Sequence, residues 1–214
     1  MLRLTIGSRI DCLKFMRAVE RNEMWDLIDP DDSSVRESMR ARKLWEQILE
    51  VRYRTGEPYL NFIDTANRAM PQTQKDKGLK IHGSNLCNEI HLPTSEERTA
   101  VCCLSSVNLE LFEDWKGTTM IRDLVRFLDN VLQFFIDNAP DEINRAKYSA
   151  TQERSLGLGA MGWHAFLHKK RIPFESESAQ VWNNVVFQYI QKEAIEESTG
   201  GSQGSVGGGE RGRR

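Results

Sequence analysis

The sequence predicts a helix-rich α/β protein with few strands. Short β-prone runs alternate with longer segments whose apolar residues recur at helical spacing, which is typical of the α/β class. The clearest such segment, residues 118–138, is apolar on more than one side, so we expect a helix that is buried on two sides. The strand candidates are too few to complete a parallel barrel or a doubly wound sheet.

The composition excludes several classes of partner. The chain has 214 residues, 39% of them hydrophobic, and a formal net charge of -2. This length suits one or two domains, and the balanced charge argues against a nucleic-acid or anionic-membrane partner. No apolar run approaches the about 20 residues that span a bilayer, and the first residues are too polar for a signal peptide. We therefore expect a cytoplasmic protein without a membrane anchor.

The first part of the chain predicts two helices and two strands. Cys12 lies on an apolar stripe that predicts a helix over residues 8–23, and it is expected to be a core residue. Residues 24–29 predict a short strand closed by a proline. The capping-box pattern of residues 34–37 predicts the start of a second helix, which Gly56 ends. A strand over residues 58–64 and a polar loop over residues 67–80 follow.

The second part predicts one strand and three helices. Residues 98–105 predict the strand, and the long helix over residues 118–138 ends before Pro140. Two further helices are expected over residues 155–170 and 178–198. From Thr199 the chain has seven glycines among sixteen residues, too little apolar surface for a packed core. We expect one folded domain over residues 1–198 and a flexible Gly/Arg-rich tail over residues 199–214. The alternative is a helix whose natural continuation has been lost.

A glycine motif over residues 157–162 matches the dinucleotide-binding fingerprint letter for letter. That fingerprint must follow a hydrophobic strand, and residues 151–155 are polar. No second strand ending in an acidic residue follows about twenty positions later. We interpret the small residues as allowing close packing of a helix against a neighbour.

Residues 83–90 hold the most informative side chains of the chain. If this stretch is extended, Asn85, Cys87 and Glu89 point to one side, about 7 Å apart at each step. Glu89 disfavours a thiolate at Cys87, so a hydrogen-atom carrier fits better than a nucleophile. Glu89 could accept a proton from a substrate hydroxyl and Asn85 could hold a second hydroxyl, with Cys102 as a reductant if it has a partner thiol.

A metal site is the main chemical alternative. His82, Cys87, His91 and Cys102 could supply nitrogen and sulfur ligands for zinc. The short paired spacings of zinc sites are not found in the sequence, so we expect no metal. The four cysteines of the chain are too few for a disulfide scaffold at this length, and we expect thiols.

Three segments in this order resemble the large catalytic subunit of aerobic ribonucleotide reductases, most closely the bacterial class I ribonucleoside-diphosphate reductases. They are Ser84-Asn85-Leu86-Cys87-Asn88-Glu89-Ile90, residues 99–109 and residues 153–162, and the resemblance covers roughly residues 10–198. Together the three segments are far more specific than any one of them. The resemblance implies a ten-stranded α/β barrel with a central finger loop, of which this chain carries a helix-rich, incomplete part.

The resemblance also implies roles for individual residues. Cys87 matches the cysteine that becomes a transient thiyl radical and removes the 3′ hydrogen of the substrate. Glu89 matches the base for the 3′-hydroxyl proton, and Asn85 matches the amide that binds the ribose, with Ser84 beside it at the substrate. Cys102 matches one of the two thiols that end as a disulfide. Cys103 receives no role, and in an extended stretch its side chain points away from that of Cys102.

The implied reaction reduces ribonucleoside diphosphates to deoxyribonucleoside diphosphates. The implied partners are the substrate, a radical-generating small subunit, a thioredoxin- or glutaredoxin-type reductant and the missing parts of the large subunit, with no directly bound cofactor. The first cysteine of the redox pair is not found in this sequence, so we expect an internal fragment that is inactive alone. The alternative is a non-catalytic α-rich interaction fragment, binding through residues 118–138, or a truncated relic of the same subunit.

Overall fold

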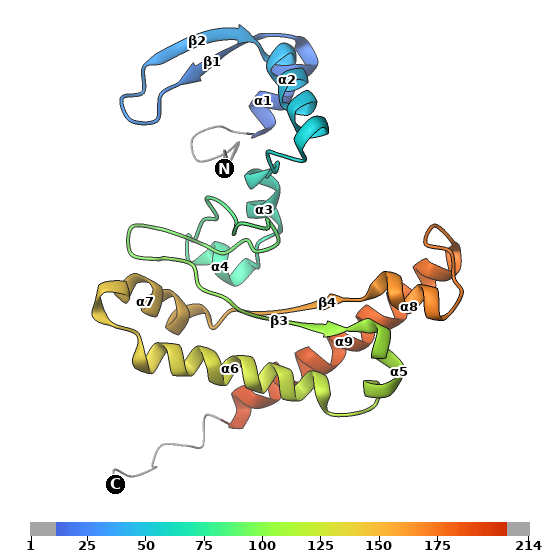
Figure 1. Cartoon of the computed structure of the whole chain (residues 1–214). Helices are drawn as coiled ribbons and strands as arrows, with labels where there is room; N and C mark the ends of the chain where they lie inside the picture. Colours follow the sequence, from blue (N-terminus) through green and yellow to red (C-terminus); the bar gives the residue numbers. More distant parts are fainter. Residues whose placement is uncertain (1–11, 205–214) are drawn as a thin grey trace. The chain divides into compact units, whose positions relative to one another are not determined.

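The computed structural model describes residues 12–204. The chain divides into two compact units, and the boundary along the sequence falls between Ala100 and Val101. Figure 1 shows the elements of both units in chain order. None of the helices in this described range has the length and apolar character that crossing a bilayer requires.

The first unit begins with a helix, a hairpin and a second helix. These are α1 (Cys12–Arg21), β1 (Met24–Ile28), β2 (Val35–Arg40) and α2 (Ala41–Thr55). The helix and the strand expected first along the chain are confirmed, although residues 8–11 lie outside the described residues. Phe15 packs edge-to-face on the rings of Trp25 and Trp45, with centroid distances of 5.1 and 6.2 Å. Cys12 is buried in the same cluster, as expected of a core thiol.

The predicted start of the second helix is wrong. Residues 35–40 form strand β2, which pairs antiparallel with β1 so that Trp25 lies opposite Met39. The acidic turn before β2 fixes this pairing, because Asp29 binds the Arg36 guanidinium at 2.8 Å. Backbone pairing across the hairpin satisfies more polar groups than a local helix cap could. The end of α2 at Gly56, whose φ is +77°, is confirmed.

The strand expected over residues 58–64 is also not formed. Helix α3 (Ile63–Ala69) begins inside that segment, and α4 (Gln72–Asp76) interrupts the expected loop. Ile63 and Met70 pack with Ile81 in a small buried cluster. Ile63 and Met70 are seven positions apart, a spacing that places residues on one face of a helix. A short β-prone run needs a neighbouring strand, and no such neighbour pairs with this one.

The second unit consists of two parallel strands packed on helices. Its order is β3 (Cys103–Asn108), η1 (Leu109–Leu111), α5 (Phe112–Trp115), α6 (Met120–Asn138), η2 (Asp141–Ile143), α7 (Asn144–Glu153), β4 (Leu156–Met161), α8 (Trp163–Lys169) and α9 (Glu177–Gly204). Figure 1 shows β3 and β4 side by side, with α6 running along them. The strand expected over residues 98–105 therefore lies a few residues later.

The glycine motif lies on strand β4 and not on a helix. The helix expected over residues 155–170 is wrong in its first half, and only α8 (Trp163–Lys169) is helical there. β4 pairs in register with β3, so that Leu104 lies beside Gly157 and Asn108 beside Met161. Glycines weaken a helix, whereas here they allow the side chains of β3 to lie close over β4.

The aromatic residues of the second unit form its core. Phe112 is fully buried and meets Trp115, Phe166 and Tyr189 edge-to-face, with centroid distances of 4.9, 6.0 and 5.9 Å. This cluster joins α5, α8 and α9 around the ends of the two strands.

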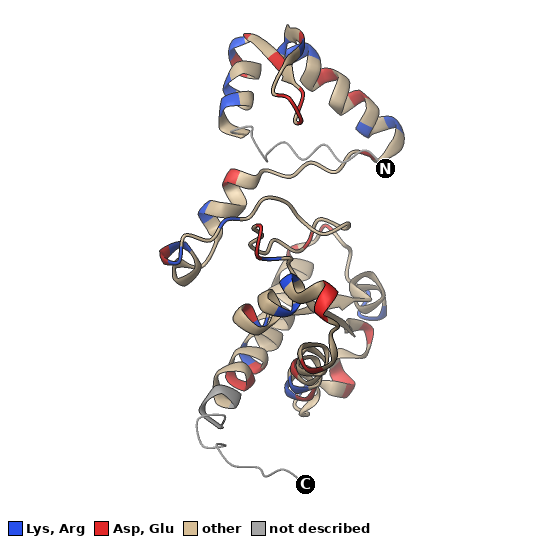
Figure 2. Ribbon diagram, turned by 90° about the vertical axis from the view of Figure 1, so that its left-hand side faces the viewer, with Lys and Arg blue, Asp and Glu red and all other residues tan. Residues whose placement is uncertain are grey.

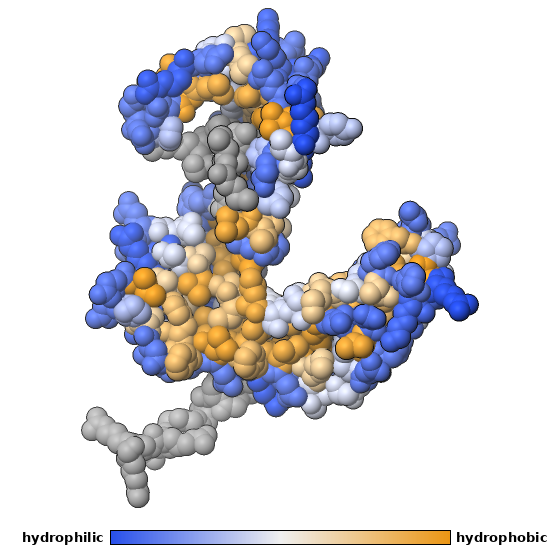
Figure 3. Space-filling view, in the orientation of Figure 1, coloured by the Kyte–Doolittle hydropathy of each residue, from blue (hydrophilic) through white to orange (hydrophobic). Residues whose placement is uncertain are grey.

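Helix α6 buries one apolar stripe and exposes another. Ile121, Val125, Leu128, Leu132 and Ile136 are buried at helical spacing. On its other side Phe127 and Phe134 remain 59% and 69% exposed. Figure 3 shows hydrophobic residues gathered on the surface around α6 and α7. The expected burial of α6 on two sides is thus wrong for the part of the chain that the structure describes.

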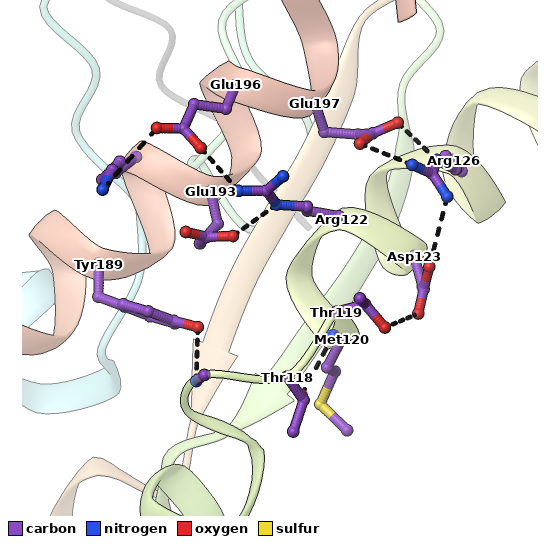
Figure 4. A network of polar contacts seen from close by, with 12 residues as sticks. Thr118, Thr119, Met120, Arg122, Asp123, Arg126, Tyr189, Glu193, Glu196 and Glu197 are labelled. Carbon is purple, nitrogen blue, oxygen red and sulfur yellow. Dashed lines mark hydrogen bonds and ion pairs between the residues drawn. The ribbon is translucent and has the colours of Figure 1, made fainter. Parts of the chain in front are cut away.

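Ion pairs join α6 to the last part of α9. Arg122 contacts Glu193 at 2.6 Å and Glu196 at 2.7 Å, and Arg126 contacts Glu197 at 2.5 Å (Figure 4). The pKa of Glu193 is lowered, mainly by its hydrogen bond with Arg122. Figure 2 shows Lys and Arg interspersed with Asp and Glu along the helices.

Helix α9 is longer than expected. It continues through Gly204, six residues beyond the predicted end of this helix, so the chain stays helical past Thr199. Residues 205–214 of the expected tail lie outside the described residues.

Candidate functional site

The segment around Cys87 forms a tight turn and not an extended strand. The Asn88 backbone N–H donates to the Asn85 carbonyl at 3.2 Å, and Asn88 has a φ of +68°. The Ile90 backbone N–H donates to Oδ1 of Asn85 at 3.0 Å. The expected alternation of side chains along this stretch is therefore wrong, because the turn reverses the chain between Asn85 and Ile90.

The turn nevertheless brings the predicted polar residues together. Nδ2 of Asn85 donates to Oε1 of Glu89 at 2.5 Å, so the amide and the carboxylate lie in direct contact. Cys87 lies between them in the turn and is exposed, as is Glu89. The turn therefore presents an exposed thiol, a carboxylate and an amide within five consecutive residues.

One side chain that received no role from the sequence, that of Asn88, holds this turn in place. Oγ of Ser84 donates to Oδ1 of Asn88 at 2.7 Å, and Nδ2 of Asn88 donates to the Leu60 carbonyl at 3.3 Å. Asn88 thus ties the turn to the segment before α3. A signal was present in the sequence, because Asn adopts positive φ more readily than other residues with a side chain.

A cavity of about 460 Å³ lies beside the base of the turn. Its lining is apolar and uncharged except for a few polar groups, among them Asn61, Asn88 and His91. Nε2 of His91 lies 3.2 Å from Oδ1 of Asn61, and Nδ2 of Asn61 is buried without a hydrogen-bond partner. The mostly apolar lining suits an uncharged group.

The predicted reductant lies in the second unit, just before β3. Cys102 is half-buried beside Gly157, on the face of the strand pair that also carries Leu104. Cys103 packs instead against the cluster around Leu132, toward α6, and burial raises the pKa of its thiol. The two adjacent cysteines therefore point to opposite faces of the strands, as strand geometry predicts.

The zinc alternative finds no support among residues 12–204. No three His, Cys, Asp or Glu side chains of this range converge as metal ligands. Nδ1 of His82 instead lies 3.1 Å from the hydroxyl of Thr94, and His91 contacts Asn61.

Comparison with known proteins identifies the family. The family model for the ribonucleotide reductase barrel domain matches residues 8–203, which is nearly the whole described range. The chain belongs to the ribonucleotide reductase barrel-domain family.

Relatives within this ribonucleotide reductase family are substantially longer. A Frog virus 3 protein named for the large subunit of ribonucleoside-diphosphate reductase is 58% identical, over 85% of this chain and 33% of that protein. The ribonucleoside-diphosphate reductase large subunit of Invertebrate iridescent virus 3 is 50% identical, over 78% of this chain and 26% of its own length. The chain thus spans about a third or less of these relatives.

A solved ribonucleotide reductase is similar to the chain in fold. The class Id alpha subunit from Actinobacillus ureae matches with a TM-score of 0.76 and 36% identity, covering 89% of this chain and 34% of that one. The Frog virus 3 protein is more similar in sequence to this chain than the bacterial subunit is. The expectation that bacterial enzymes resemble the chain most closely is therefore wrong for this pair. The described residues form a helix-rich part of the barrel domain without a closed barrel.

Proposed function

We propose that this chain carries the radical-cysteine part of a ribonucleotide reductase active site. The reaction is the reduction of ribonucleoside diphosphates to deoxyribonucleoside diphosphates, which supplies precursors for DNA. The observation that carries the proposal is the turn that exposes Cys87 between Asn85 and Glu89, themselves joined by a hydrogen bond. Membership of the family supports it, as does the order of the three matching segments.

Each residue of the turn has a distinct task in this proposal. As a thiyl radical, Cys87 takes the hydrogen atom from the 3′ carbon and later returns it. Glu89 accepts the 3′-hydroxyl proton, while Asn85 and Ser84 hold the substrate. The 2′ hydroxyl leaves as water, and the two electrons come from Cys102 and a second thiol, which join as a disulfide.

The proposed architecture is part of a ten-stranded α/β barrel. β3 and β4 are adjacent parallel strands of that barrel, and residues 83–90 are its central finger loop. A pair of parallel strands needs cover on both faces, which supports the larger barrel. In this proposal the partial barrel domain spans residues 1–198 and the Gly/Arg-rich segment spans residues 199–214, with α9 continuing across that boundary to Gly204.

The proposed partners follow from the reaction. They are the ribonucleoside diphosphate, a radical-generating small subunit, a thioredoxin- or glutaredoxin-type dithiol and the remaining part of a large subunit. The compartment is the cytoplasm, where such dithiols are kept reduced. Without a second redox thiol and a complete barrel, the chain by itself should not turn over substrate.

A hybrid large subunit tests the proposal. Residues 8–203 replace the matching segment of the Frog virus 3 relative, and deoxyribonucleoside diphosphate formation is measured with a small subunit and a dithiol. We expect activity in the hybrid, none in its Cys87→Ser or Cys102→Ser variant, and retained activity in its Cys103→Ser variant. Retained binding of the small subunit shows that the hybrid is folded. A folded hybrid without activity, or an active Cys87→Ser variant, would contradict the proposal.

The exposed apolar side of α6 favours a second candidate function, binding to another protein chain. Phe127, Val131 and Phe134 expose apolar surface that soluble proteins normally cover. In this case the chain associates as its concentration rises, and Cys87→Ala changes nothing. Sedimentation of the parent and of Cys87→Ala at several concentrations distinguishes this role from the catalytic one.

A further inference from the structure

The two faces of the β3–β4 pair differ in character. Helix α6 and its neighbours cover the face that carries Cys103 and Val107. The opposite face carries Cys102 and Leu104, with the glycines of β4 beside them. Leu104 is largely exposed there, so no helix covers this face within residues 12–204.

The missing side chain of Gly157 leaves room for the Cys102 thiol. A Cβ at residue 157 would lie 3.3 Å from Sγ of Cys102 and 2.2 Å from Cδ2 of Leu104. Gly157 has ordinary strand backbone, so space and not backbone conformation is what a side chain lacks there. Sulfur and carbon atoms in contact prefer a longer separation, and a methyl group would displace Sγ by a few tenths of an ångström.

We infer that Gly157 is a positioning residue for Cys102, because the missing side chain leaves the sulfur in place and accessible on the open face of the strand pair. The inference rests on the proposed function, in which Cys102 reduces the substrate. A methyl group at residue 157 would lie against this sulfur, cover part of it and shift it sideways on the open face. Catalysis is sensitive to such shifts, because a displacement of about 1 Å can lower a rate by about a hundredfold.

The same strand offers a matched control. Gly159 lies two residues further along β4, on the same face, and a Cβ there would meet Oγ of Ser106 at 3.2 Å. Gly159→Ala therefore adds the same methyl group to the same face without touching a cysteine. Leu104→Ala supplies the other control, because it removes the closer clash and leaves the Cys102 contact alone.

The test is site-resolved alkylation of the purified full chain. Iodoacetamide modification of each cysteine is followed over time by mass spectrometry of its peptide. We expect Gly157→Ala to slow modification of Cys102 by about two- to fivefold, because the methyl group covers part of the sulfur. The double variant Leu104→Ala with Gly157→Ala should modify Cys102 more slowly than Leu104→Ala alone, by the same factor. In Gly159→Ala the rate at Cys102 should equal that of the parent chain. The rate at the exposed Cys87 should be the same in all variants.

The sign of the effect separates positioning from damage to the fold. Unfolding of the second unit would speed modification of both Cys102 and Cys103, whereas the inference predicts slower modification of Cys102 only. Unchanged Cys102 rates in both Gly157→Ala backgrounds, or equal slowing in Gly159→Ala, would overturn the inference. The proposed function is tested separately by the hybrid enzyme, so either can fail without the other.

Discussion

Gly162 joins the end of β4 to the start of α8, and replacing it should destabilise the second unit strongly. Its φ is +77°, and a Cβ there would lie 2.3 Å from Oδ1 of Asn108 and 3.3 Å from the backbone nitrogen of Glu110. Oδ1 of Asn108 accepts the Glu110 N–H at 3.1 Å, which caps η1 after β3. Gly162→Ala therefore strains the backbone and also displaces a cap.

The structure supplies the expected magnitude and a control. A left-handed conformation costs a residue with a Cβ about 1–2 kcal/mol. Displacing the Asn108 cap adds about 1 kcal/mol for the hydrogen bond and about 1 kcal/mol or more for crowding. Gly117 has a φ of +80° with nothing near its Cβ position, so Gly117→Ala shows the backbone cost alone. We expect Gly162→Ala to cost about 2 kcal/mol more than Gly117→Ala.

Urea unfolding followed by tryptophan fluorescence measures this difference. Trp115, Trp163 and Trp182 all lie in the second unit, which also contains both glycines. With a urea dependence of about 2 kcal/mol per molar, the unfolding midpoint of Gly162→Ala should lie about 1 M below that of Gly117→Ala. Equal midpoints for the two variants would show that the Asn108 contact contributes nothing and would refute the reasoning.

Three further predictions concern the turn, an ion pair and the exposed face of α6. Asn88→Ala removes the hydrogen bonds to Ser84 and Leu60 and should speed amide hydrogen exchange over residues 83–90 about tenfold or more. Leu86→Ala, at an exposed position, should leave this exchange unchanged. Similar exchange rates in the two variants would contradict the anchoring role of Asn88. The hydrogen bond from Lys170 lowers the pKa of Glu113, so its stabilisation is present above the ordinary glutamate pKa of about 4.3 and is lost as the pH falls through the lowered value. Gln in place of Glu113 should therefore lower the thermal midpoint at pH 7 but not at pH 2.5, and a difference that is independent of pH would argue against this ion pair. The double variant Phe127→Glu with Phe134→Glu should weaken self-association in sedimentation experiments. Tyr53→Glu, which changes an exposed aromatic residue of the first unit, should leave self-association unchanged. Association that persists in the double variant would place the contact elsewhere.

The sequence was sufficient where the signal is local. Helices α1, α6 and α9 follow from apolar residues at helical spacing, and Gly56 marks the end of α2 through its left-handed conformation. The family was recognisable because three segments with unusual residue types occur in a fixed order. The roles of Cys87, Glu89, Asn85, Ser84 and Cys102 remain proposals that rest on that recognition and on the turn.

Tertiary structure decided the remaining elements, since strands are stabilised by partners that local sequence does not specify. Residues 34–37 have a helix-cap pattern, but residues 35–40 form a strand because β1 lies alongside. Residues 156–161 form a strand because β3 lies alongside. The turn at Cys87 likewise depends on Asn88 reaching the distant Leu60 carbonyl. By itself the sequence determined the family, the helical segments and the chemical groups. The tertiary structure decided which segments pair as strands and how Asn85, Cys87 and Glu89 lie, because backbone hydrogen bonds between distant segments outweigh local preference.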